Sequence, residues 1–119
     1  MEIFCEFSFE AAHYLPRVPE GHKCARVHGH SYLVEIHVEG PVDEQAGWVV
    51  DFGDIKVAVA PLHAQLDHYL LNEVPGLENP TSENLARWIW SGLSGTLPLS
   101  LVMVRETRTS GCIYRGEGR

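Results

Sequence analysis

The chain has 119 residues, of which 45% are hydrophobic and 21% are charged, a composition typical of one soluble globular domain over residues 1–119. The formal net charge of −7 disfavours nucleic acid as a partner and anions in general, although a local basic patch can still bind an anion. No apolar run reaches the roughly 18 residues of a membrane span, and the N-terminus does not resemble a signal peptide. We therefore expect a cytoplasmic protein without membrane association.

The first half of the chain contains two segments of alternating polarity. Residues 3–9 alternate strictly between apolar and polar side chains, which predicts a half-buried strand. Residues 31–38 alternate in the same way, and Gly40-Pro41 ends this second predicted strand.

Two helices are predicted next. Residues 54–70 carry apolar side chains at helical spacing after a possible cap at Asp54, and Pro61 inside them predicts a kink or a later start. A second helix follows a cap at Thr81 or Ser82. Its apolar face is formed by Leu85, Trp88, Ile89 and Leu93.

The chain ends in a predicted hairpin. Residues 99–107 form a strand, and residues 112–115 form its short partner across a turn at Ser110-Gly111. The order of these elements predicts an α+β domain, with an antiparallel four-stranded sheet and two helices on one face.

Three histidines are candidate metal ligands. His28 and His30 lie two residues apart, so in an extended chain both rings point to one face, and counting along the strand makes it the apolar face. The same count places His13 on the apolar face of the first strand. A buried imidazole needs a partner, because unpaired burial costs about 1–3 kcal/mol. Zinc is one such partner, and three ligands leave a coordination position open. Hydrogen bonds to the backbone in an ordinary core are the alternative. Histidines in a loop and on two solvated faces have no predicted role: His22, His37 and His63.

Cys24 lies four residues before His28, between Lys23 and Arg26, whose positive charges favour the reactive thiolate. Three interpretations fit this position: a fourth zinc ligand in a closed structural site, a small buried residue, or a general base or nucleophile beside an open site. The remaining cysteines fall in strand patterns and are interpreted as packing residues without a disulfide: Cys5 and Cys112.

Two carboxylates are candidate functional groups. Asp67 can orient His68 only if the chain leaves the first helix there, because adjacent helical residues do not face each other; a solvated helix end is the alternative. Glu106 ends an apolar strand face. It either pairs with Arg105 or Arg108, or accepts hydrogen bonds from the guanidine-like edge of a ligand such as a pterin.

Together these residues resemble the 6-pyruvoyltetrahydropterin synthase family, and in particular its bacterial branch. The resemblance covers nearly the whole chain and includes the specific element Cys-x₃-His-Gly-His at residues 24–30. The other matching segments are residues 9–13, 50–52, 66–68, 79–84, 88–90, 106–107 and 114–117.

The resemblance implies a tunnelling fold, in which several subunits (a tetramer or a hexamer) close into a barrel with sites at the subunit interfaces. It implies that Zn²⁺ is bound by three histidines: His13, His28 and His30. It also implies that Cys24 is the proton acceptor rather than a ligand, that His68 oriented by Asp67 is its acid–base partner, and that Glu106 anchors the pterin.

Enzymes of the bacterial branch are lyases. They convert 7,8-dihydroneopterin triphosphate to 6-carboxy-5,6,7,8-tetrahydropterin, acetaldehyde and triphosphate, a step towards queuosine and other deazapurines. The resemblance therefore implies a pterin triphosphate as substrate. Two alternatives stay open. One is a 6-pyruvoyltetrahydropterin synthase, which eliminates triphosphate. The other is a zinc-stabilised binding module without catalysis, in which Cys24 is the fourth ligand.

Overall fold

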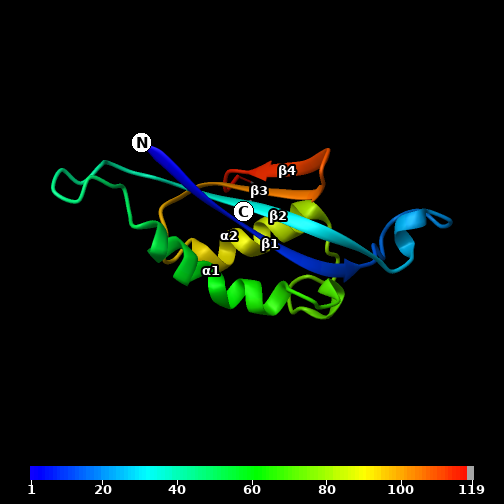
Figure 1. Ribbon diagram of the computed structural model, residues 1–119. Helices are drawn as coiled ribbons and strands as arrows, with labels where there is room; N and C mark the ends of the chain where they lie inside the picture. Colours follow the sequence, from blue (N-terminus) through cyan, green and yellow to red (C-terminus); the bar gives the residue numbers. More distant parts are fainter. Residues whose placement is uncertain (118–119) are drawn as a thin grey trace.

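The computed structural model describes residues 1–117, which form a four-stranded antiparallel sheet with two helices on one face (Figure 1). The strands lie side by side in the order of the sequence. They are β1 (Glu2–His13), β2 (His28–Glu39), β3 (Leu99–Thr107) and β4 (Ser110–Tyr114). The helices are α1 (Phe52–Leu66) and α2 (Ser82–Leu93), and the 3₁₀ turns are η1 (Lys23–Ala25) and η2 (Leu71–Glu73). The α+β architecture predicted from the sequence is confirmed.

The two long strands β1 and β2 extend beyond the predicted segments, to 12 residues each. Their antiparallel register pairs His13 with His28 and Ala11 with His30. Because side chains alternate along a strand, this register places the candidate ligands on the same side of neighbouring strands. That side faces the helices, and its most buried residues are Phe9, Ala11, His13, Tyr32, Val34, Ile36 and Val38.

Helix α1 starts earlier and ends earlier than predicted. The side chain of Asp51, not Asp54, caps it by accepting a hydrogen bond of 2.9 Å from the backbone N–H of Gly53. The helix runs through Pro61 from Phe52, so the expected later start is wrong. It ends at Leu66 rather than at residue 70, because the backbone then turns to the extended conformation.

Helix α2 begins as predicted. The hydroxyl of Thr81 accepts a hydrogen bond of 3.1 Å from the backbone N–H of Asn84, which satisfies a donor of the first turn. Trp88 is only half-buried, because its indole N–H donates to the Pro75 carbonyl at 3.1 Å. The face of α2 that packs into the core is formed by Leu85, Ala86, Ile89, Trp90 and Leu93.

The hairpin of β3 and β4 turns at Arg108 and Thr109, two residues before the predicted turn. Gly111 belongs to β4 and pairs with Arg105. A side chain at position 111 would collide with the carbonyl oxygen of Val104, so the strand itself requires glycine there. The register shifts between Arg105 and Thr107, which places Glu106 at an irregularity of β3.

The described residues form an elongated body of 57 × 26 × 26 Å, with the core between the sheet and the two helices. Two long connections, residues 14–27 and 40–51, project at opposite ends (Figure 1). Within residues 1–117, no helix combines the length and the apolar character that a membrane span requires.

Candidate metal centre and active site

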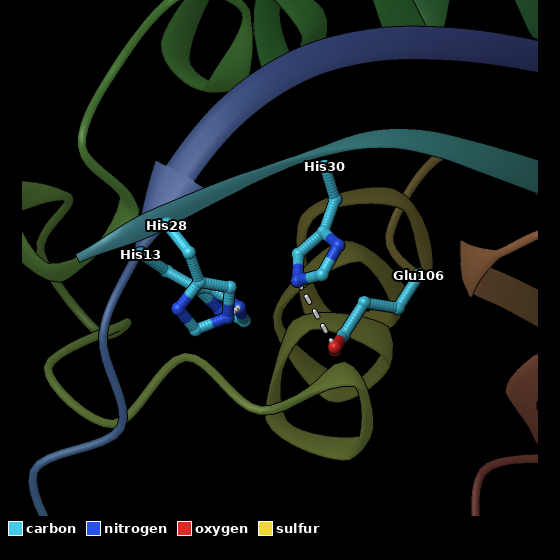
Figure 2. A group of neighbouring side chains, drawn as sticks. All are labelled: His13, His28, His30 and Glu106. Carbon is cyan, nitrogen blue, oxygen red and sulfur yellow. Dashed lines mark hydrogen bonds and ion pairs between the residues drawn. The ribbon is translucent and has the colours of Figure 1, made fainter. Parts of the chain in front are cut away.

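Three histidines and one glutamate meet beside the connection of residues 14–27, at the ends of β1 and β2 (Figure 2). One side-chain nitrogen or oxygen atom from each of His13, His28, His30 and Glu106 lies within 4.8 Å of the others. His13 is fully buried, and the other three are partly buried. The alternation of side chains along β1 and β2 therefore brings the predicted ligands together, and the neighbouring strand β3 adds Glu106.

The outer ring nitrogens of two histidines bond to backbone carbonyls. His13 Nδ1 lies 2.8 Å from the Pro80 oxygen, and His28 Nδ1 lies 2.7 Å from the Arg26 oxygen. A carbonyl can only accept, so both Nδ1 atoms carry a hydrogen, and in a neutral ring the Nε2 atom then presents a lone pair. The two Nε2 atoms are 3.0 Å apart. Two lone pairs at this distance repel each other unless a cation lies beside both.

The third histidine faces the carboxylate. His30 Nε2 lies 3.1 Å from Glu106 Oε1 (Figure 2). The other carboxylate oxygen accepts a hydrogen bond of 2.9 Å from the Ser82 hydroxyl. Among the described residues, His30 Nε2 is buried without any partner in hydrogen-bond geometry. Within residues 1–117 Glu106 forms no ion pair with Arg105 or Arg108, one of its two predicted alternatives, and Arg105 donates to the Arg108 carbonyl at 3.1 Å.

Burial controls the charge of the His13 and His30 imidazoles. Desolvation lowers the pKa of His13 below its ordinary value, and the Pro80 carbonyl offsets part of this effect. Desolvation also lowers the pKa of His30, against the opposing influence of the Glu106 carboxylate. Both rings are therefore mainly neutral at pH 7, which is the form that binds metals.

The donor set fits a metal ion. It offers one nitrogen from each of three imidazoles and one carboxylate oxygen. One of these nitrogens, His30 Nε2, is buried without a partner in hydrogen-bond geometry. The carbonyl bonds to the Nδ1 atoms of His13 and His28 are the outer contacts that fix metal-ligating histidines in proteins. The four side chains can therefore hold a metal ion.

Cys24 lies outside this group. It is half-buried in the 3₁₀ turn η1, four residues before His28. Its backbone N–H donates to the Nδ1 atom of His22 at 3.0 Å, and its carbonyl accepts from the Leu15 N–H at 2.8 Å. Among residues 1–117, the candidate metal group does not include Cys24, which disfavours its interpretation as a fourth ligand.

The side chains of Asp67 and His68 are in contact, which we predicted to be possible only if the chain leaves the helix before His68. Asp67 Oδ2 lies 2.9 Å from His68 Nδ1, and the contact forms because His68 adopts a left-handed conformation with φ of 64°. The other Asp67 oxygen accepts from the Glu10 N–H at 3.0 Å. This bond, and then the His68 ring, lower the pKa of Asp67. The pair therefore forms at the end of α1, with the Asp67 side chain 30% exposed and the His68 side chain 77% exposed.

One open pocket connects this pair to the metal group. The pocket has a volume of about 490 Å³, and its lining includes both His30 and His68. The His68 side chain is 77% exposed, whereas that of His30 is 16% exposed. The pocket therefore joins an exposed imidazole to the edge of the candidate metal centre.

Several supporting residues have no signal in the sequence pattern. The Asn72 side chain bonds to both backbone groups of Tyr14, accepting from its N–H at 3.0 Å and donating to its carbonyl at 2.9 Å. The buried Tyr32 hydroxyl lies 3.2 Å from His13 Nδ1. Such contacts join residues that are distant in the chain, so spacing does not reveal them.

The expectation of a solvated His37 is also wrong, because its ring is half-buried and lies 2.8 Å from Glu35.

Comparison with known proteins identifies the family. The model of the 6-pyruvoyl tetrahydropterin synthase family matches residues 2–117. A 6-carboxy-5,6,7,8-tetrahydropterin synthase of Synechocystis sp. is 45% identical over 119 residues, covering 94% of this chain and 91% of that protein. One of Bacillus subtilis is 36% identical over 127 residues, covering 96% and 84%. The structure of the Caenorhabditis elegans 6-pyruvoyl tetrahydropterin synthase superposes with a TM-score of 0.90 at 26% identity, covering 98% of this chain and 96% of that one. The chain belongs to the 6-pyruvoyl tetrahydropterin synthase family and has its fold.

Proposed function

We propose that this protein is a zinc-dependent carbon–carbon lyase that converts 7,8-dihydroneopterin triphosphate to 6-carboxy-5,6,7,8-tetrahydropterin, acetaldehyde and triphosphate. The observation that carries the proposal is the convergence of three histidines in a chain whose bacterial relatives are named for this product. On the same family relationship we propose a place in queuosine or related deazapurine biosynthesis. Three free cysteines fit the reducing conditions of a cytoplasmic enzyme.

The proposed zinc ligands are His13, His28 and His30. Three neutral imidazoles are a common ligand set for catalytic zinc, and carbonyl contacts at the outer nitrogens of His13 and His28 orient two of the rings. When bound, zinc supplies a Lewis acid that polarises oxygens of the substrate side chain. We assign Glu106, the fourth member of the group, to the pterin rather than to zinc, because a carboxylate can accept two N–H bonds from a guanidine-like edge.

The proposed proton-transfer groups are Cys24, as acceptor, and His68, oriented by Asp67. The contact between Asp67 Oδ2 and His68 Nδ1, at 2.9 Å, orients the ring, and we assign the opposite ring nitrogen to proton transfer. Cys24 does not line the pocket that His30 and His68 share. We therefore propose a homo-oligomer, a tetramer or hexamer, in which a neighbouring copy completes each site. The high exposure of the His68 side chain suits such a position.

Two alternatives give different products or none. One is the reaction of a 6-pyruvoyl tetrahydropterin synthase, the enzyme for which the Caenorhabditis elegans structure is named, and this reaction would release triphosphate without acetaldehyde. A zinc-stabilised binding module has no turnover. The position of Cys24 outside the candidate metal group argues against the module, in which this thiol would close the site.

The experiment is incubation of zinc-loaded protein with 7,8-dihydroneopterin triphosphate, with products identified by mass spectrometry. We expect 6-carboxy-5,6,7,8-tetrahydropterin and acetaldehyde. A 6-pyruvoyl product would contradict the proposed reaction and support the first alternative. In parallel, Cys24→Ala should keep its zinc and lose turnover. Joint loss of zinc and folding in this variant would refute the catalytic role of Cys24.

A further inference from the structure

His22 caps the short turn that carries Cys24. The turn η1 contains only Lys23–Ala25, and His22 is its N-cap residue. His22 Nδ1 accepts a hydrogen bond of 3.0 Å from this N–H. The backbone of His22 is held as well, because its N–H donates to the Pro19 carbonyl at 3.0 Å and its carbonyl accepts from Ala25 at 3.1 Å. The imidazole therefore occupies the position that serine, aspartate or asparagine fills in ordinary helix caps.

The capped residue, Cys24, is also held through its backbone carbonyl. The Cys24 carbonyl accepts from the Leu15 N–H at 2.8 Å, so hydrogen bonds hold both backbone groups of Cys24. A cysteine side chain has only one rotatable bond before its sulfur, so the position of the thiol follows closely from its backbone. Loss of the imidazole acceptor would leave the Cys24 N–H without its partner and release one of the two restraints.

The same turn continues to the candidate metal centre. The Arg26 N–H donates to the Lys23 carbonyl at 3.3 Å, and the Arg26 carbonyl bonds to His28 Nδ1 at 2.7 Å. The bond between Arg26 and His28 does not involve His22. A change at position 22 should therefore disturb the thiol while the metal ligand keeps its orientation.

We propose that His22 is a positioning residue for the Cys24 thiol, an inference that rests on the proposed function of Cys24 as proton acceptor. Its ring acts through the backbone of Cys24 and does not touch the reacting atoms. The hydrogen-bond acceptor is the property that matters, so asparagine, a favourable cap residue with a side-chain oxygen, should replace histidine. Alanine should not replace it.

The test compares His22→Ala, His22→Asn and, as a control, Glu20→Ala, which removes an exposed side chain from the same connection. Zinc content, kcat, KM and the rate of Cys24 alkylation by iodoacetamide are measured, with alkylation read at the Cys24 peptide by mass spectrometry. Removal of a cap typically changes a local equilibrium by about fivefold. We therefore expect His22→Ala to lower kcat and to accelerate alkylation by about fivefold, with unchanged KM and zinc content.

His22→Asn and Glu20→Ala should both match the wild type. If His22→Ala leaves kcat and alkylation unchanged, or if His22→Asn behaves like His22→Ala, the positioning role is refuted. If His22→Ala does not fold, His22→Leu serves as the variant without an acceptor, under the same expectations. Failure of the proposed function gives a different result: the wild type has no turnover, while alkylation of Cys24 still reports whether His22 holds the turn.

Discussion

The Nε2 atoms of His13 and His28 lie 3.0 Å apart, while the Nδ1 atom of each ring bonds to a backbone carbonyl. Where both rings are neutral, these bonds to the outer nitrogens direct the two Nε2 lone pairs toward each other, and the lone pairs repel. A shared cation removes this repulsion, so the backbone prepares the pair for metal binding. The burial that keeps His13 neutral acts in the same direction.

Removal of a ligand should abolish metal binding. We expect His13→Ala to retain less than one tenth of the zinc of the wild type, whereas His37→Ala, which changes a ring outside the group, should retain all of it. Zinc at about 100 times its Kd should stabilise the wild type by about 2.7 kcal/mol. Elemental analysis and thermal unfolding, with and without chelator, measure both effects. Full zinc occupancy in His13→Ala would contradict the assignment.

Replacement of Glu106 should affect substrate binding more than metal binding. Glu106→Gln keeps the shape of the side chain and removes its charge, so the pterin should lose charge-assisted hydrogen bonds of about 1.5–3 kcal/mol. We expect kcat/KM to fall by about 10- to 100-fold, mainly through KM, with zinc content unchanged. Glu39→Gln, an exposed carboxylate on β2, is the control. Loss of zinc in Glu106→Gln would identify Glu106 as a metal ligand instead.

The Asp67 carboxyl should titrate below its ordinary range. Its pKa is lowered from 3.8 by the Glu10 N–H and the His68 ring. For a depressed pKa, the stabilising contribution is present above the unfolded-state value and is lost as the pH falls through the folded-state value. NMR of the carboxyl carbon should give a midpoint below 3.8, and His68→Ala should move it upwards. An unchanged midpoint in His68→Ala would show that the two side chains are not coupled.

Asn72 should hold the end of β1 beside His13. Asn72→Asp keeps an acceptor for the Tyr14 N–H but places a carboxylate near the Tyr14 carbonyl, which loses its donor. Leaving a partly buried polar group unpaired costs about 1–3 kcal/mol, so we expect lower stability and weaker zinc binding. Urea unfolding and zinc competition with a chromophoric chelator measure these effects. Unaltered zinc affinity would limit Asn72 to a purely structural role.

The part of the site that lies on regular strands was predictable. Period-two alternation in β1 and β2 is a property of extended backbone, so His13, His28 and His30 could be placed on one face before their register was known. Glu106 stood out as a carboxylate at the end of an apolar strand face. The sequence could not show that it approaches His30, because that contact depends on the pairing of β2 with β3.

The remaining parts depend on local backbone geometry. The left-handed conformation of His68 and the early cap at Asp51 are set by tertiary packing and by competing hydrogen bonds, which propensity alone does not decide. His22 and Asn72 act through single hydrogen bonds to backbone groups. Such contacts have no periodicity, and only the folded chain shows them.

In the proposed lyase, zinc on the three histidines is required for the reaction. The most direct measurement is acetaldehyde release from 7,8-dihydroneopterin triphosphate while zinc is added to metal-free protein. We predict that the initial rate rises in proportion to bound zinc and stops rising at about one ion per chain, the capacity of a single three-histidine site. A rate that is independent of zinc, or zinc-loaded protein that releases no acetaldehyde, would contradict this account.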